Sequence, residues 1–248
     1  MRDFAKLPLF LKELRLATMK SLWEPFSKQA IEENWSHVGY LANLCEHEIQ
    51  ARLQNKLKRN LKQAQLPAGK ALSTFDFSHA PNLNKAKIQD LTENTTWVNN
   101  KENLLIFGPS GVGKTHLAAA IAYGMIERGI RVLFTSTTAL VQKLQVARQQ
   151  LCLPQTLAKL DLYQVLILDD IGYVRKDDAE THALFELIAH RYESGSLIVT
   201  ANQPFSEWDS IFADTTMTVA AIDRLVHHAT IIEIAAESYR RTHSLQKI

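Results

Sequence analysis

Apolar residues in the second half of the chain fall into short runs separated by stretches of helical spacing. Each run is almost wholly apolar over four residues, which is typical of strands buried on both faces of a parallel sheet. The runs occupy residues 104–107, 132–135, 165–168, 197–200 and 231–234. Between them, apolar positions recur at helical steps, as in helices that cover a sheet. The pattern predicts an α/β domain with a five-stranded parallel sheet.

The first part of the chain has a different pattern. Leucines recur at steps of three and four residues up to about residue 64, which predicts a small all-helical region. This rhythm is then lost in a stretch that contains prolines and many Asn and Thr residues, as in a connector. We therefore predict a helical domain over residues 1–65, a connector over 66–95 that wraps onto the next domain, and the α/β domain over 96–248.

Composition narrows the choice of partners and compartment. A hydrophobic content of 46% suffices for a full core, and a net charge of only +2 means that any nucleic-acid surface must come from local clustering. Cys45 and Cys152 lie far apart, which suits a reducing compartment and argues against a disulfide framework or a cysteine-built zinc site. The chain shows neither a signal-peptide pattern nor about 18 uninterrupted apolar residues. We expect a cytoplasmic protein.

A glycine-rich segment lies between the first predicted strand and a stretch of helical spacing. It fits the pattern of a phosphate-binding loop, whose glycines let main-chain N–H groups approach phosphate oxygens at the positive end of a helix. We expect Lys114 to reach the terminal phosphates and Thr115 to give its hydroxyl to Mg²⁺. The segment predicts nucleotide binding, with ATP as the ligand, by Gly108, Pro109, Ser110, Gly111, Val112, Gly113, Lys114 and Thr115.

Polar residues follow two further strands. Asp169 and Asp170 end the third strand as in a Walker B element, where Asp169 would hold Mg²⁺ and Asp170 would polarise the attacking water. Many proteins of this class have Glu at the second position, so the role of the shorter Asp170 as general base stays open. The fourth strand leads to Asn202, which we expect to sense the same water. Alternatively, the two acids cap the following helix, and Asn202 starts the turn before Pro204.

A basic segment interrupts the otherwise balanced charge, because no acidic residue occurs between Glu48 and Asp76. On a helix, four apolar residues would form one buried stripe, and the cations on the remaining face could meet DNA phosphates. An ordinary solvated helix face is the alternative. The stripe consists of Ile49, Leu53, Leu57 and Leu61, and the candidate DNA-binding residues are Arg52, Lys56, Lys58, Arg59 and Lys62.

Two arginines near the end of the chain, Arg224 and Arg240, suit phosphate because a guanidinium donates in parallel pairs. Neither is close to the phosphate loop in sequence. On spacing alone, an ion pair on a helix surface explains Arg224 and a solvated charge explains Arg240.

These motifs together resemble the IstB family of transposition helper ATPases. The resemblance covers nearly the whole chain. It implies an initiator-type AAA+ module, related to DnaC helicase loaders, with a nearly absent helical lid. Within it, Arg224 matches the arginine finger that inserts into a neighbouring subunit's nucleotide, and Arg240 matches the sensor 2 arginine. Besides the loop and Asp169-Asp170, it rests on residues 66–70, 190–193, 200–202, 205–208, 221–225 and 238–240, with Ala201 where Ser is common.

The resemblance also implies a function. Such a helper oligomerises as a ring or spiral on duplex DNA, with ATP at subunit interfaces, and delivers target DNA to its transposase, while hydrolysis controls disassembly. A DnaC-like loader is the alternative, which would prefer single strands and capture a replicative helicase. A small-molecule kinase would leave Asn202 and Arg224 without roles. Because Asp170 is shorter than the usual Glu, its role as general base stays open. A nucleotide-gated scaffold with negligible ATP turnover is therefore a further alternative.

Overall fold

The computed structural model describes residues 4–172, 177–210 and 214–239. The chain divides into two compact units, residues 1–59 and 60–248. The first unit begins with η1 (Phe4–Lys6) and α1 (Leu7–Glu13), followed by α2 (Ala17–Glu32) and most of the long helix α3 (His37–Ala64). These helices confirm the helical pattern that the leucine spacing predicts.

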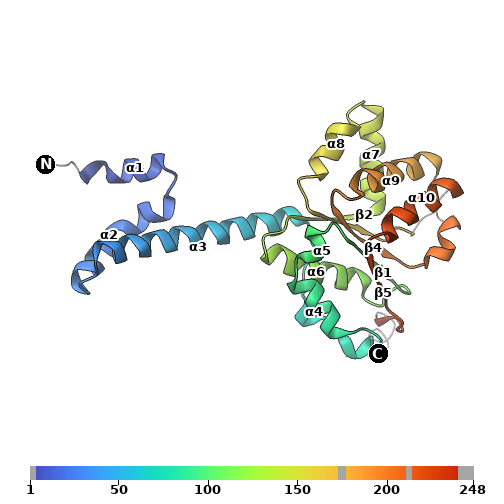
Figure 1. Ribbon diagram of the computed structural model, residues 1–248, viewed down its shortest axis with the longest axis horizontal. Helices are drawn as coiled ribbons and strands as arrows, with labels where there is room; N and C mark the ends of the chain where they lie inside the picture. Colours follow the sequence, from blue (N-terminus) through green and yellow to red (C-terminus); the bar gives the residue numbers. More distant parts are fainter. Residues whose placement is uncertain (1–3, 173–176, 211–213, 240–248) are drawn as a thin grey trace, which may run out of the picture. The chain divides into compact units, whose positions relative to one another are not determined.

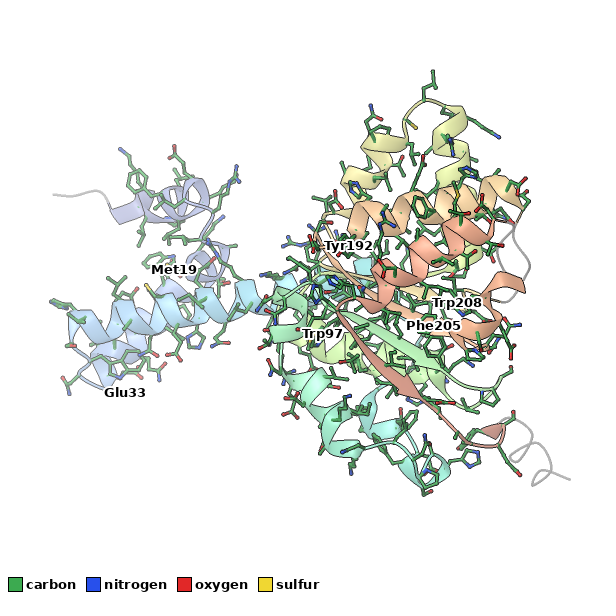
Figure 2. The ribbon with its side chains drawn as sticks, turned by 45° about the vertical axis from the view of Figure 1, so that its right-hand side comes forward. Met19, Glu33, Trp97, Tyr192, Phe205 and Trp208 are labelled. Carbon is green, nitrogen blue, oxygen red and sulfur yellow. The ribbon has the colours of Figure 1, made fainter. Side chains whose placement is uncertain are left out.

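A buried acid fixes α3 against the start of α2. The Glu48 carboxylate accepts hydrogen bonds from the main-chain N–H groups of Thr18 (2.8 Å) and Met19 (3.1 Å), which lack partners within the first turn of their helix. Arg52 Nε donates to the same carboxylate at 2.8 Å. Although burial by itself raises the pKa of Glu48, the Met19 N–H and Arg52 together hold that pKa below its ordinary value. Met19, labelled in Figure 2, and Leu44 are buried beside this cap.

The prediction that the apolar stripe of α3 is packed is wrong for Ile49 and Leu53, whereas Leu57 and Leu61 are partly buried. Ile49 is 56% exposed and Leu53 is 54% exposed, so the stripe does not form the buried face there. The buried face of this part of α3 instead contains Leu44 and Glu48, one helical turn apart. Spacing shows which residues share a face of a helix, but the capping of α2 by Glu48 decides which face is buried.

The second unit contains the five-stranded parallel sheet. Its order is β2-β3-β4-β1-β5, so the fourth strand lies between the phosphate-loop strand and the Walker B strand. Each predicted strand is found, with ends that differ by at most two residues. The strands are β1 (Asn103–Phe107), β2 (Val132–Ser136), β3 (Val165–Asp169), β4 (Ser196–Ala201) and β5 (Ala229–Glu233).

Helices cover both faces of the sheet (Figure 1). The helix α6 (Lys114–Glu127) packs with α4 (Lys85–Glu93) on one face. On the other face, α7, α9 and α10 build a core that is mostly leucine and that also contains the fully buried Trp208. These three helices are α7 (Thr137–Gln149), α9 (Asp178–Arg191) and α10 (Thr215–Val226), and the shorter elements are η2 (Leu72–Thr74), η3 (Phe77–His79), α5 (Thr96–Asn99), α8 (Leu153–Leu160) and η4 (Phe205–Ser210).

Among the described residues, we find no helix whose length and apolar character would suffice to cross a membrane.

Candidate nucleotide-binding site

The phosphate loop joins the end of β1 to the start of α6. Gly111 has a φ of +86°, and a side chain there would collide with Ser238. Gly113 has a φ of +102°, and a Cβ atom there would lie 3.0 Å from the Phe75 ring. Both positions need glycine because the conformation and the space exclude side chains. The loop therefore presents main-chain N–H groups at the helix N-terminus, the arrangement that binds phosphate.

Lys114 is the first residue of α6 and is only 7% exposed. Its ammonium donates to the carbonyl oxygens of Gly108 (2.7 Å) and Pro109 (2.8 Å) and to Asn202 Oδ1 (2.7 Å). An ammonium has three donors, so these contacts satisfy a buried cation. The amine thus lies at the phosphate loop, a position that fits the predicted contact with the terminal phosphates.

Thr115 and Asp169 meet at the carboxyl edge of the sheet. Thr115 Oγ1 lies 3.0 Å from Asp169 Oδ1 and 3.2 Å from Oδ2. Burial raises the pKa of Asp169 above its ordinary value, and hydrogen bonds from Thr200 and Thr115 oppose that shift. A hydroxyl and a carboxylate are hard oxygen donors of the kind that Mg²⁺ prefers, so this pair fits the predicted metal role.

Asp170 and Asn202 are brought together as well. Asn202 Nδ2 donates to Asp170 Oδ1 at 2.9 Å, while its Oδ1 accepts from Lys114. The alternative that the two acids cap the following helix is wrong, because the N-cap of α9 is Asp177. Lysine, amide and carboxylate thus form one chain of hydrogen bonds across the site.

A cavity of about 430 Å³ lies over the loop, within the range of about 300–1,000 Å³ usual for small-molecule sites. The loop, Asp170, Thr200 and Asn202 line one side of it. The remaining lining residues, which the sequence motifs do not identify, come from the connector, from the first turn of α6 and from the segment after β5. These further residues are Gly69, Lys70, Thr74, Phe75, Asp76, His79, His116 and Tyr239.

The connector and the segment after β5 also bind each other. His79 Nε2 lies 3.0 Å from the carbonyl oxygen of Glu237, and the His79 and Tyr239 rings meet edge to face at 5.2 Å. The Tyr239 N–H donates to the Gly111 carbonyl of the loop at 3.1 Å. No local pattern could have identified these residues, because they become part of the site only when both segments fold onto the loop.

Arg224, near the end of α10, lies at the other edge of the sheet. Its Nη1 donates to the Ala220 carbonyl at 2.8 Å, and its guanidinium lies 5.2 Å from the centre of the Phe185 ring. The next carbonyl, that of Leu225, accepts from the side chain of Asn103, where β1 begins. The loop follows the opposite end of β1, about 13 Å away at the usual rise of a strand. Arg224 is therefore not brought to the nucleotide cavity of its own chain.

The predicted DNA-binding residues differ in their surroundings. Arg52 is held by Glu48 and also donates to the Arg15 carbonyl at 2.8 Å, so it stabilises the first unit. The other four side chains are exposed, and no ion pair within the described residues involves them; they are Lys56, Lys58, Arg59 and Lys62. Arg240, the predicted sensor 2 arginine, lies outside the described residues.

The parallel sheet, the phosphate loop and the paired carboxylates define a P-loop protein of the AAA+ type. Solved structures show the same fold at low sequence identity. The crystal structure of the DnaC helicase loader is 21% identical, with a TM-score of 0.57 over 68% of this chain and 98% of that one. AMPPCP-bound DnaA from Aquifex aeolicus is 17% identical, with a TM-score of 0.57 over 74% of this chain and 57% of that one.

Residues 10–247 match the family described as IstB-like ATP binding protein, and the chain belongs to this family. A putative insertion sequence ATP-binding protein of Sinorhizobium fredii is 51% identical, over 98% of this chain and 82% of that protein. The IS21 putative ATP-binding protein of Pseudomonas aeruginosa is 35% identical, over 95% of this chain and 88% of that protein. The resemblance inferred from the motifs is thus confirmed.

Proposed function

We propose that this chain is an ATPase that assembles on duplex DNA, with ATP at its subunit interfaces, and delivers target DNA to its transposase. ATP hydrolysis controls disassembly. The observation that carries the proposal is the gathering of Lys114, the Thr115–Asp169 pair and the Asp170–Asn202 pair at one edge of the sheet. Among the described residues, the site of this chain then contains the proposed phosphate-binding, metal-binding and water-activating groups, but no arginine.

The chemistry follows from these side chains. Lys114 and the loop N–H groups bind the terminal phosphates, and Thr115 and Asp169 would hold Mg²⁺, which supplies charge neutralisation there. Asp170 accepts a proton from a water molecule whose oxygen attacks the γ-phosphorus, while the bond from that phosphorus to the leaving oxygen of ADP breaks. Asn202 orients the Asp170 carboxylate and the water.

Arg224 completes the site from a neighbouring subunit in this proposal. Its place at the opposite edge of the sheet supports a role towards another chain's nucleotide rather than its own. ATP then contacts two subunits at once and stabilises the assembled state by linkage, whereas ADP stabilises it less.

Two observations support DNA as a partner, and the first of them also supports a transposase. Several relatives are named as ATP-binding proteins of insertion sequences, and a helper of that kind must meet DNA. The exposed cations of α3 offer contacts to the phosphate backbone, which carry affinity without reading the base sequence.

A mixing experiment tests the shared site. Asp170→Asn and Arg224→Ala should each lower DNA-stimulated ATP turnover, by roughly 10³-fold for the arginine. If the site is shared, a one-to-one mixture recovers about a quarter of wild-type turnover, since random assembly joins the two intact halves at about one interface in four. Phosphate release on duplex DNA measures this.

The controls separate the parts of the proposal. Lys114→Ala should bind no nucleotide, and native binding by that variant would contradict the site. Mixed oligomers that form but recover no turnover would contradict the role of Arg224 towards a neighbour. Stimulation by single strands and not by duplex would instead favour the helicase-loader alternative.

A further inference from the structure

We propose that Thr200 is a positioning residue of this site, whose hydroxyl sets the orientation of Asp169 relative to Asp170. The inference rests on the proposed ATPase function. It assigns a role to Thr200, which takes no part in the chemical steps described above. Thr200 is 1% exposed, lies at the end of β4 and faces the nucleotide cavity.

The hydroxyl of Thr200 bonds to both acidic residues at once. Its Oγ1 donates to Asp169 Oδ1 at 2.7 Å and accepts from the main-chain N–H of Asp170 at 2.8 Å. One hydroxyl has one proton to donate and lone pairs to accept, so both bonds form together. Thr115 Oγ1 donates to the same Asp169 oxygen at 3.0 Å. The Asp169 carboxylate is thereby held by two hydroxyl groups.

The main chain of Thr200 holds the same turn. Its carbonyl oxygen accepts from the Ile171 N–H at 3.0 Å, so Thr200 contacts the last residue of β3 and the two residues that follow it. Within this turn Asp170 has a φ of +61°, a left-handed conformation that is uncommon for residues other than glycine. The hydrogen bond from its N–H to the Thr200 hydroxyl stabilises this conformation and points the side chain towards Asn202.

The register of the sheet explains why Thr200 lies next to Asp169. Leu168 pairs with Val199, so the next residues, Asp169 and Thr200, lie side by side where the two strands end. Asn202 follows two residues later and holds the carboxylate of Asp170. Thr200, near the end of β4, thus positions Asp169, the proposed metal-binding acid. Asn202, just after the strand, positions Asp170, the proposed water-activating acid.

Ser196 provides a matched control on the same strand. It is fully buried, and its Oγ has no hydrogen-bond partner within the described residues. Ser196→Ala therefore removes a buried hydroxyl from β4 without touching the turn after β3. Thr200→Val removes the hydroxyl and keeps the shape, whereas Thr200→Ser keeps the hydroxyl and removes a methyl group.

The experiment uses the full chain with two readouts. The first is ATP turnover on duplex DNA as a function of Mg²⁺, and the second is the gain in affinity for a fluorescent ATP analogue when Mg²⁺ is added. Thr200→Val should lower turnover by about 10- to 100-fold and lose most of the Mg²⁺-dependent gain, as for other residues that orient metal ligands. Its analogue affinity without Mg²⁺ should change little. Thr200→Ser should stay within about threefold of wild type, because it keeps the hydroxyl.

Three results would overturn the inference, each in variants with native circular dichroism and melting temperature. The first is wild-type turnover and Mg²⁺-dependent binding in Thr200→Val. The second and third are losses in Thr200→Ser or in Ser196→Ala as large as those in Thr200→Val. Failure of the proposed function gives a different result, namely that wild type and Lys114→Ala bind the analogue equally. If wild type binds but does not turn over ATP, the Mg²⁺-dependent gain in binding still decides the role of Thr200.

Discussion

At the scale of single residues, Asn202 links Lys114, the lysine expected to bind phosphate, to Asp170, the acid proposed to activate water. Its amide oxygen accepts from Lys114 and its amide nitrogen donates to Asp170, so the two contacts fix the orientation of the amide group. When a terminal phosphate takes the place of Asn202 as a partner of Lys114, the amide oxygen becomes available to water. The residue therefore suits the sensing role that the sequence suggests.

Replacing Asn202 should separate turnover from binding. We expect Asn202→Ala to lower ATP turnover by about 10²-fold, the usual cost of losing one preorganised donor, while ATP affinity changes by less than about tenfold. Gln203→Ala is the control, since Gln203 is the neighbouring amide and its Oε1 has no hydrogen-bond partner in the described residues. Steady-state phosphate release together with analogue titration checks both, and equal losses in the two variants would argue against a sensing role.

At the scale of elements, the contact between α2 and α3 depends on a charged cap. The Glu48 carboxylate satisfies two N–H groups at the start of α2, and its side chain is only 6% exposed. The pKa of Glu48 is lowered in the folded chain. Its contribution to stability is therefore present above the unfolded pKa of about 4.3 and is lost as the pH falls through the folded value.

Removing this carboxylate should destabilise the first unit. Glu48→Ala leaves the N–H groups of Thr18 and Met19 without their partner and should lower the free energy of unfolding at pH 7 by about 1–3 kcal/mol. Glu46→Ala, which removes an exposed acid from the same helix, should change little. Denaturant unfolding at pH 7 and at pH 3 measures both variants. The difference between wild type and Glu48→Ala should shrink at the lower pH, and a constant difference would contradict the charged cap.

At the scale of the whole molecule, charge is distributed unevenly. The net charge is only +2, yet α3 carries exposed cations that no ion pair in the described part of the chain neutralises. Lys56 and Arg59 lie one turn apart on one face of α3. Affinity for DNA should therefore depend on this helix rather than on the overall charge.

Neutralising this face should change how DNA affinity depends on salt. If both cations contact phosphates, the double variant Lys56→Ala/Arg59→Ala should reduce the slope of log affinity against log salt by about two. The control Lys87→Ala/Lys159→Ala removes the same charge from other exposed positions and should leave the slope unchanged. Titration of duplex DNA at several salt concentrations tests this, and equal slopes in wild type and the α3 variant would exclude the contact.

Much of the site follows from local sequence. The five strands, the phosphate loop and Asp169-Asp170 are identified by short patterns, because each depends on neighbours within a few residues. The strand order places β4 between β1 and β3, and this arrangement brings Asn202 to Lys114. The exposed stripe at Ile49 and Leu53 was not predictable, because helical spacing does not show what covers a face.

The sequence by itself determined the fold class, the family, and the residues of the loop and the acidic pair, since these need only backbone conformation and adjacent side chains. The tertiary structure alone decided that Phe75, His79 and Tyr239 line the cavity, that Thr200 bonds to both acids, and that Arg224 lies at the opposite edge of the sheet. These facts depend on which distant segments meet when the chain packs its core. Such contacts are set by the shape and register of whole elements, which no local pattern contains.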